Sequence, residues 1–225
     1  MSRVFFITGT DTAVGKTIVA NALIKLANDR GLSTRGLKPV AAGCYLRDGL
    51  QVNEDAWDLM HIASVKSDYE TVNPAALREP MAPHIAADRE GVRLNAHSLA
   101  DHCAALLPAA DFTVIEGAGG WLVPLNETET VADIAVELST PVILVVGLRL
   151  GCINHALLTA AVVRAAGLPL AGWVANRIDP EMAVPKENIA ALKDRLDAPL
   201  LGVIPPMENP SAVFAAPHLN FDALP

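Results

Sequence analysis

The fold is decided by the stretch Gly9-Thr10-Asp11-Thr12-Ala13-Val14-Gly15-Lys16-Thr17. It follows the apolar run at residues 4–8 and precedes residues 18–26, so the local order is strand, turn and helix. Glycine lets the backbone wrap closely around an anion, and the first amides of a helix point outward without partners. Lys16 adds an ammonium group suited to the β- and γ-phosphates, and Thr17 adds a hydroxyl group suited to Mg²⁺. The stretch therefore predicts a site for a nucleoside triphosphate.

The match to the phosphate-loop pattern is imperfect. The strict spacing places the first glycine where Thr10 stands, whereas here it lies one residue earlier, at Gly9. We therefore predict a longer variant of the loop. The alternative is a glycine-rich turn before an ordinary helix, and the Gly-Lys-Thr sequence between a strand and a helix argues against it.

Composition indicates an α/β protein, which we expect to form one domain over residues 1–225. The hydrophobic fraction is 52% with only 4% aromatic residues, as in parallel sheets that helices cover on both faces. The formal net charge is -8 and the basic residues form no patch, which argues against nucleic acid as a partner.

The cysteines and the amino-terminal residues favour the cytoplasm as the compartment of the protein. Cys44, Cys103 and Cys152 are odd in number and widely spaced, so they suggest neither a disulfide framework nor a metal site. The first residues imitate a secretory signal, but Asp11 and Lys16 interrupt the apolar run too early. No apolar run reaches the roughly 20 residues that span a bilayer. We expect a cytoplasmic protein without a membrane partner.

Strands and helices alternate along the chain. We predict strands at residues 4–8, 34–40, 112–116, 141–146, 170–176 and 199–204, and helices at 18–29, 55–63, 94–107, 131–138, 152–166 and 185–196. This order predicts a mostly parallel central sheet with right-handed crossovers and helices on both faces. The rest of 41–91 is irregular, as expected of a segment that covers a site. The tail beyond Pro210 has little periodicity.

Three charged residues stand where a parallel sheet binds ligands, at or near strand ends. Lys38 precedes Pro39, which ends strand pairing, and its ammonium could neutralise an anionic intermediate or simply extend into solvent. Glu116 ends an apolar strand before a glycine cluster and could bind Mg²⁺ or be a solvated acid. Asp55 alone is read more simply as a favourable charge at a helix start.

The helix expected at residue 152 offers a further anion site. The amides of residues 151–154 are free to bind a carboxylate or a phosphate, although an ordinary helix start is the simpler interpretation. Cys152 has no base placed near it by spacing, so we interpret it as a small buried residue. His84 and His155 are likewise interpreted as structural histidines.

Several motifs together resemble those of the dethiobiotin synthetases of biotin biosynthesis. They are the loop at residues 9–17, Lys38-Pro39-Val40, residues 116–121, residues 151–155 and residues 172–176. The resemblance runs from about residue 3 to residue 206. Other phosphate-loop families are expected to share the first motif but not the others. The resemblance implies a phosphate-loop NTPase, or Rossmann-like, architecture.

The resemblance also implies a reaction. In this family 7,8-diaminopelargonic acid takes up CO2 as a carbamate, and ATP phosphorylates that carbamate with the help of Mg²⁺. The second amine then attacks the mixed anhydride, which closes a ureido ring and gives dethiobiotin, ADP and phosphate. Such a site must hold the amine, the carbamate and the γ-phosphate in line while neutralising charge.

Roles for particular positions follow from the same resemblance. The catalytic positions are Lys38, Lys16 and Thr12, and the Mg²⁺ ligands are Thr17, Asp55 and Glu116, which replaces the simpler interpretation of Asp55. Substrate-binding positions are Lys38, Ala42, Gly151, Cys152, Ile153 and Asn154, the last four reaching the substrate of a neighbouring subunit in a homodimer with its sites at the interface. ATP-binding positions are Ala13, Val14, Gly15, Lys16, Thr17, Ile18, Asp55, Glu116, Gly117, Ala118, Gly119, Asn176, Arg177, Pro205, Pro206 and Met207.

The chain departs from the family pattern at three positions. Ala13 stands where a glutamate is common, Ala42 replaces a serine whose hydroxyl touches the substrate, and Ala212 replaces a ribose-binding glutamate of some members. Loss of one neutral hydrogen bond costs on the order of 1 kcal/mol, which weakens binding without abolishing activity. The alternative function is a nucleotide-switch ATPase of the partitioning or metallochaperone kind. Those proteins usually carry a lysine near the start of the loop, where this chain has Thr10 and Asp11.

Overall fold

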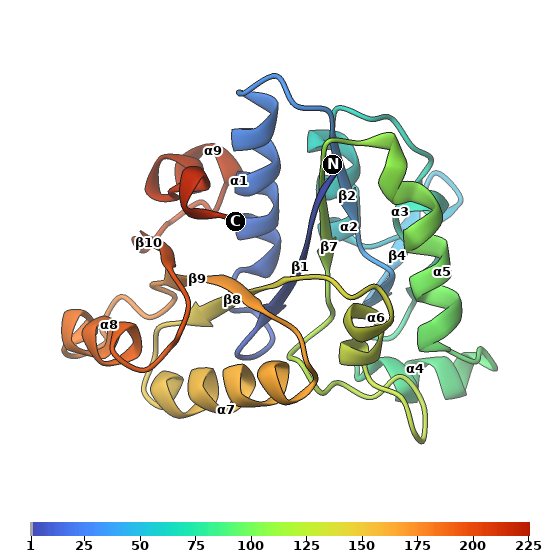
Figure 1. Ribbon diagram of the computed structural model, residues 1–225. Helices are drawn as coiled ribbons and strands as arrows, with labels where there is room; N and C mark the ends of the chain where they lie inside the picture. Colours follow the sequence, from blue (N-terminus) through green and yellow to red (C-terminus); the bar gives the residue numbers. More distant parts are fainter. Residues whose placement is uncertain (1) are drawn as a thin grey trace.

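The computed structural model describes residues 2–225, and its centre is one six-stranded sheet (Figure 1). The strand order is β10-β9-β8-β1-β7-β2, and every neighbouring pair is parallel. The strands are β1 (Arg3–Gly9), β2 (Thr34–Leu37), β7 (Phe112–Glu116), β8 (Val142–Gly147), β9 (Leu170–Asn176) and β10 (Leu200–Ile204). The order places β1, which leads into the glycine-rich loop, between β7 and β8. The predicted α/β class and parallel sheet are confirmed.

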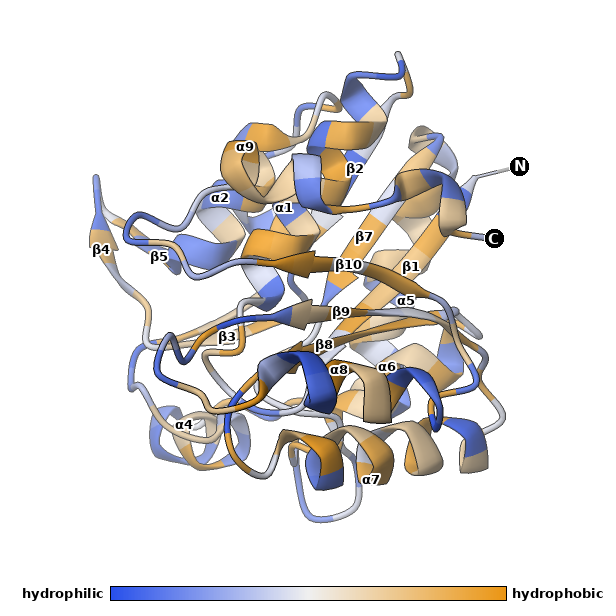
Figure 2. Cartoon of the chain, turned by 90° about the vertical axis from the view of Figure 1, so that its left-hand side faces the viewer, coloured by the Kyte–Doolittle hydropathy of each residue, from blue (hydrophilic) through white to orange (hydrophobic). Residues whose placement is uncertain are grey.

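Helices cover both faces of this sheet. One face packs against α1 (Lys16–Asn28), α2 (Glu54–Ile62), α3 (Tyr69–Val72) and α9 (Ala212–Ala215), and the other against α4 (Pro83–Glu90), α5 (Ala96–Leu106), α6 (Val131–Glu137), α7 (Cys152–Ala165) and α8 (Pro185–Lys193). Figure 2 shows β8, β9 and β10 between α1 and α9 above and α7 and α8 below. None of the helices within residues 2–225 combines the length and the apolar character that crossing a membrane requires.

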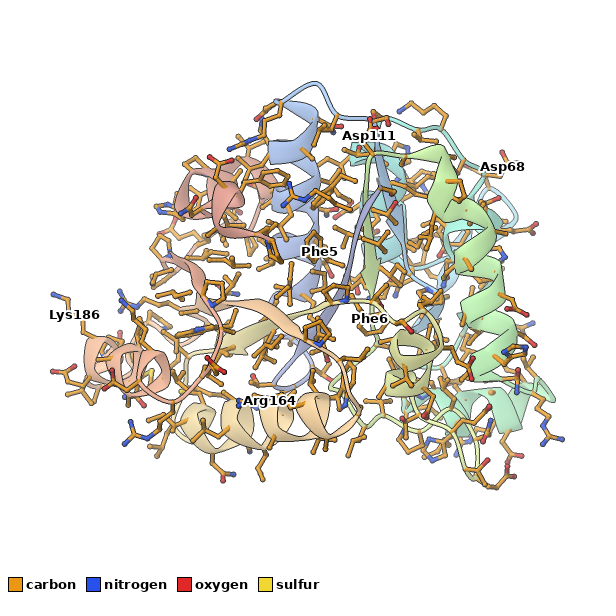
Figure 3. The ribbon with its side chains drawn as sticks, viewed as in Figure 1. Phe5, Phe6, Asp68, Asp111, Arg164 and Lys186 are labelled. Carbon is orange, nitrogen blue, oxygen red and sulfur yellow. The ribbon has the colours of Figure 1, made fainter. Side chains whose placement is uncertain are left out.

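The apolar side chains of the sheet form two cores, because the side chains of each strand point alternately to its two faces. Phe5 and Phe6, labelled in Figure 3, are adjacent in β1 but belong to different clusters of buried residues, because successive side chains of a strand point to opposite faces. Ile143 and Leu144 of β8 divide in the same way. Strands buried on both faces therefore have the continuous apolar sequences from which the sheet was predicted.

The strand predicted at residues 34–40 stops at Leu37, in agreement with the prediction that its pairing fades near Lys38. Pairing with β7 ends at Leu37, because Pro39 has no amide hydrogen to donate. Val40 instead starts β3 (Val40–Ala42), which pairs in parallel with β6 (Ala75–Leu77) in a separate ladder. Lys38 lies at the break between the two strands.

The segment at residues 41–91 has more regular structure than its sequence indicates. The predicted helix at 55–63 is α2, and the Asn53 side chain accepts a hydrogen bond from the amide of Asp55 at its start. The segment also contains β3, β6, α3, α4 and a hairpin of β4 (Tyr45–Arg47) and β5 (Leu50–Val52). Most of these elements have three or four residues, which is too few to produce a periodic pattern.

All three cysteines are free and buried; for Cys152 this agrees with its interpretation as a small buried residue. Burial raises the pKa of the Cys44 thiol to about 11 and that of Cys103 to about 12, so both stay protonated near neutral pH.

The carboxyl-terminal tail, which has little periodicity, packs on the α1 side of the sheet. It contains α9 and the short 3₁₀ helices η2 (Ala216–His218) and η3 (Phe221–Ala223); a third, η1 (Leu107–Ala109), follows α5. The Phe221 ring is 2% exposed and lies 5.2 Å from the Phe112 ring of β7, centroid to centroid. The guanidinium groups of Arg3 and Arg30 lie 5.1 and 4.6 Å from the Phe221 ring centre. The tail is thus part of the core.

Phe221→Ala should lower the free energy of unfolding by about 3 kcal/mol or more, because it removes a buried ring from beneath two guanidinium groups. Urea denaturation measures this loss. Phe214→Ala is the matched control: its ring is 45% exposed, and we expect a change within about 0.5 kcal/mol. Equal small losses in the two variants would show that the tail does not stabilise the sheet.

Candidate active site

The turn between β1 and α1 depends on two glycines. A Cβ atom at Gly9 would lie 2.5 Å from Cγ2 of Val14 and 3.1 Å from the Asp11 carbonyl oxygen. Gly15 has φ +91°, and a Cβ atom there would overlap the side-chain amide of Asn176. That amide donates a 2.8 Å hydrogen bond to the Val14 carbonyl oxygen. The end of β9 therefore fixes the turn from outside, and the first amides of α1 stay free for an anion.

Lys16 follows the turn and is 7% exposed. Its Nζ donates a 2.9 Å hydrogen bond to the Asp11 carbonyl oxygen. Burial lowers the pKa of its ammonium group to about 8, although the negative charge of Glu116 acts in the opposite direction and raises that pKa. An incompletely compensated buried cation of this kind has its charged form stabilised when an anion binds.

A second lysine lies between two carboxylates close to the same turn. The Lys38 Nζ atom lies 2.7 Å from Oδ2 of Asp55 and 2.6 Å from Oε1 of Glu116. The Thr17 hydroxyl donates a 2.9 Å hydrogen bond to the same Glu116 oxygen. Lys38 is 4% exposed and Glu116 is fully buried. The break after β2, the start of α2, the end of β7 and the start of α1 thus bring four predicted residues together.

Charge and burial act in opposite directions in this cluster. Burial alone would lower the pKa of Lys38, but Glu116 and Asp55 outweigh it and raise that pKa. Burial would raise the pKa of Asp55, but the Lys38 ammonium holds it below its usual range. Burial raises the pKa of Glu116, and Lys38 only partly offsets the effect. Lys38 therefore carries its charge firmly, whereas Glu116 lacks part of the compensation that it needs.

The donor atoms suit a small hard cation. Oε2 of Glu116 is buried and has no hydrogen-bond partner, and the Asp55 carboxylate and the Thr17 hydroxyl are also near the Lys38 ammonium. Within residues 2–225 no group of three or more His, Cys, Asp or Glu side chains could hold a metal by itself. Two carboxylates and one hydroxyl fit Mg²⁺, which usually binds few protein oxygens and completes its shell with water and phosphate.

The turn and the cluster border one cavity of about 790 Å³. Residues that the sequence predicts for the site and that line it are Thr12, Ala13, Gly15, Lys16, Thr17, Ile18, Lys38, Ala42, Asp55, Glu116, Ala118 and Gly119. Other lining residues are Asn21, Ala41, Asn53, Asp58, Pro80, Met81, Ala82, Pro83, Val123, Pro210, Ser211 and Ala212. The irregular segment at 41–91 supplies much of the second set, in agreement with the expectation that it covers a site.

The remaining predicted residues do not line this cavity. They are Val14, Gly117, Asn176, Arg177, Pro205, Pro206, Met207, Gly151, Cys152, Ile153 and Asn154. Asn176 reaches the turn through Val14, and the Arg177 amide donates to the carbonyl of Ile204, so this group follows the ends of β9 and β10. Gly151, with φ +94°, begins α7 away from the cavity. Cys152 is 1% exposed, as its interpretation as a small buried residue predicts.

Sequence reasoning missed an ion pair at the turn. The Arg149 guanidinium pairs with the Asp11 carboxylate, although the two residues are far apart in the chain. It also missed Asn21, whose side-chain oxygen is buried without a partner among the cavity-lining residues. Neither Arg149 nor Asn21 belongs to a motif. The only available signal was that residues 147–151 follow a buried strand and therefore lie at the same edge of the sheet as the turn.

This fold and site define a phosphate-loop nucleotide-binding protein of the α/β class. MinD of Pyrococcus horikoshii, solved as a complex with Mg-ADP, has a TM-score of 0.61 at 22% identity and covers 99% of this chain and 95% of its own. FtsY of Elizabethkingia anophelis, solved with GDP, has a TM-score of 0.56 at 16% identity over 96% of this chain and 63% of its own. Likeness at these identities concerns the fold alone.

Sequence comparison identifies the particular family. A family model described as an AAA domain matches residues 3–212. The ATP-dependent dethiobiotin synthetase BioD of Cellvibrio japonicus is 54% identical over 99% of this chain and 97% of its own length. The enzyme of the same name from Nitrosospira multiformis is 50% identical over 94% of this chain and 92% of its own. The chain belongs to the ATP-dependent dethiobiotin synthetase family.

Proposed function

We propose that this protein is a dethiobiotin synthetase, which uses ATP to close a ureido ring on 7,8-diaminopelargonic acid and CO2. One observation supports this most directly: two lysines, Lys16 and Lys38, face one cavity together with the amides of the phosphate loop. A reaction that brings ATP to an anionic carbamate needs cationic groups at both reactants. Family membership over almost the whole chain supports the same reaction.

The residues of the chain divide the chemistry between them. Lys16 and the loop amides bind the β- and γ-phosphates, with Thr12 beside them. Lys38 stabilises the carbamate that forms from one amine and CO2. The carbamate oxygen takes the γ-phosphoryl group and ADP leaves; the second amine then attacks the carbonyl carbon, a C–N bond forms, and phosphate departs. Because the cavity is bounded by both lysines, the reactants are held near one another throughout.

Mg²⁺ is proposed as the metal, held by Thr17, Asp55 and Glu116. When bound, it neutralises charge on the phosphates. The unpartnered Glu116 Oε2 atom supports this assignment. The Lys38 Nζ atom lies between Asp55 and Glu116, 2.7 and 2.6 Å from their carboxylate oxygens. Lys38 therefore competes with a cation for these two carboxylates, and the third N–H of its ammonium group is available to a carbamate.

We also propose a homodimer in which α7 of one subunit completes the site of the other. Residues 151–154 lie outside the cavity of their own chain, and the helix amides there suit the substrate carboxylate. Leu150, just before them, is 97% exposed, as expected of a residue that a partner covers. Ile153 and Asn154 would contact the substrate bound by the partner subunit. Cys152 is buried beneath them and packs the first turn of α7.

The remaining proposals concern the nucleotide and the setting of the enzyme. The adenine lies along Asn176, Arg177 and residues 205–207, at the ends of β9 and β10. Residues 1–225 act as one ligase domain in the cytoplasm, on small molecules. The net charge of -8 supports the absence of nucleic acid among its partners.

Purified protein with diaminopelargonate, bicarbonate and Mg-ATP should form dethiobiotin, ADP and phosphate, measured by mass spectrometry.

Lys38→Ala should reduce turnover by about 100-fold or more, since a lost charge stabiliser costs a few kcal/mol in the transition state, while ATP binding stays close to native. Lys25→Ala, which removes a partly exposed lysine paired with Asp29, is the control and should keep native turnover.

No ring-closed product at saturating substrate would contradict the proposed reaction. ATP hydrolysis that a protein or membrane partner stimulates, without a response to the diamine, would instead support a nucleotide-switch ATPase. Native turnover in Lys38→Ala would remove Lys38 from the mechanism.

Lys38→Met should bind Mg²⁺ more tightly than the native protein in the absence of nucleotide, because the competing ammonium is gone. We expect an affinity gain of about tenfold, which corresponds to roughly 1.4 kcal/mol, measured by isothermal titration calorimetry. Lys25→Met serves as the control and should bind Mg²⁺ as the native protein does. Equal affinity in all three proteins would contradict competition between Lys38 and the metal.

Mixing two inactive variants tests the shared site. In a dimer of Lys38→Ala with Asn154→Asp subunits, one site has both native residues and the other has neither. Random exchange of subunits should therefore restore about one quarter of native turnover if the sites span a twofold interface. The mixture is refolded together and compared with each variant alone. No recovery, with mixed dimers shown by mass spectrometry, would place both residues at the site of the same chain.

A further inference from the structure

The phosphate loop contains an acidic side chain that its proposed ligand should repel. Oδ1 of Asp11 accepts a 2.7 Å hydrogen bond from the amide of Thr12, and the Asp11 carbonyl oxygen accepts from Lys16 Nζ at 2.9 Å. Asp11 thus shapes the loop at two points. The same carboxylate puts a negative charge beside a site for an even more negative triphosphate, which weakens binding unless that charge is compensated.

Arg149 supplies the compensating charge from a distant part of the chain. Its guanidinium pairs with Oδ2 of Asp11, so the two oxygens of that carboxylate have separate partners. The side chains are 43% and 44% exposed. Ion pairs as exposed as this contribute little to stability, so stabilisation of the fold does not account for the arrangement.

The backbone holds Arg149 at this place. The Gly147 amide donates a 3.3 Å hydrogen bond to Oγ1 of Thr10, which joins the turn after β8 to the phosphate loop. The Cys152 amide donates to the Arg149 carbonyl oxygen at 3.0 Å, at the start of α7. Arg149 therefore sits in a short turn fixed at both ends, and its cation stays near the loop.

We propose that Arg149 is a positioning residue for the nucleotide: it neutralises Asp11, so that the loop keeps the shape that Asp11 gives it without repelling the triphosphate. The proposal rests on the proposed binding of ATP at this loop. Arg149 acts through Asp11 and not by direct contact with the phosphates. The charge of Asp11 therefore decides whether loss of Arg149 matters.

The test is a double-mutant cycle on ATP affinity. Arg149→Gln should weaken binding of Mg-ATP about fivefold, since one unscreened charge near the phosphates changes the binding energy by an amount of that order. Arg149→Lys should stay close to native. The double variant Asp11→Asn, Arg149→Gln should recover most of the loss, because asparagine keeps the acceptor for the Thr12 amide and removes the charge. Calorimetry measures each dissociation constant without the diamine.

Salt and a matched arginine separate an electrostatic effect from a structural one. The loss in Arg149→Gln should shrink in 0.5 M salt, where the Debye length falls to roughly 4 Å. Arg30→Gln removes another exposed ion pair, with Asp222 at 3.1 Å, and should leave ATP affinity unchanged. Thermal unfolding of each variant reports folding directly.

Several outcomes would overturn the proposal. Native ATP affinity in Arg149→Gln would exclude a role in nucleotide binding. A double variant as weak as Arg149→Gln, or a loss that salt does not reduce, would indicate direct contact with the nucleotide or a structural defect. All these readouts concern ATP binding, so they stand whether or not the protein forms dethiobiotin. Failure of the native protein to bind Mg-ATP would instead contradict the proposed function.

Discussion

The arrangement of the site depends on one constraint, a lysine ammonium buried between two carboxylates. A buried charge is tolerated only when it is paired and hydrogen-bonded, so Lys38, Asp55 and Glu116 must stay in contact. Each comes from a different element: the break after β2, the start of α2 and the end of β7. Thr17 on α1 adds a fourth. The ends of two strands and two helices are thereby held around one cavity.

The sheet was predictable because its signals are local and repeated. Central strands such as β8 are buried on both faces and have continuous apolar sequences, and helices with recognisable starts, such as Asn53 before α2, separate the strands. Lys16, Thr17 and Glu116 could be placed at one edge because parallel strands end there together. Spacing alone could not bring Asp55 into the cluster, and only the family resemblance did so.

The structure that the sequence did not predict consists of short or distant pairings. The ladder of β3 and β6 has three residues in each strand, and Pro39, which correctly marks the end of pairing in β2, gives no sign that a second ladder starts at Val40. The pair Asp11–Arg149 joins two turns through side chains that no local pattern connects. The tail carries apolar residues without a period, so its docking on α1 was not visible.

The contact between the two ends of the chain has a consequence for biosynthesis. The Arg3 guanidinium donates a 3.3 Å hydrogen bond to the carbonyl oxygen of Leu224 and lies over the ring of Phe221. Since the chain is made from its amino end, the first strand leaves the ribosome long before these partners are synthesised. The surface of β7 that Phe221 covers therefore stays open until residues 221–224 have been synthesised, so this part of the core closes late.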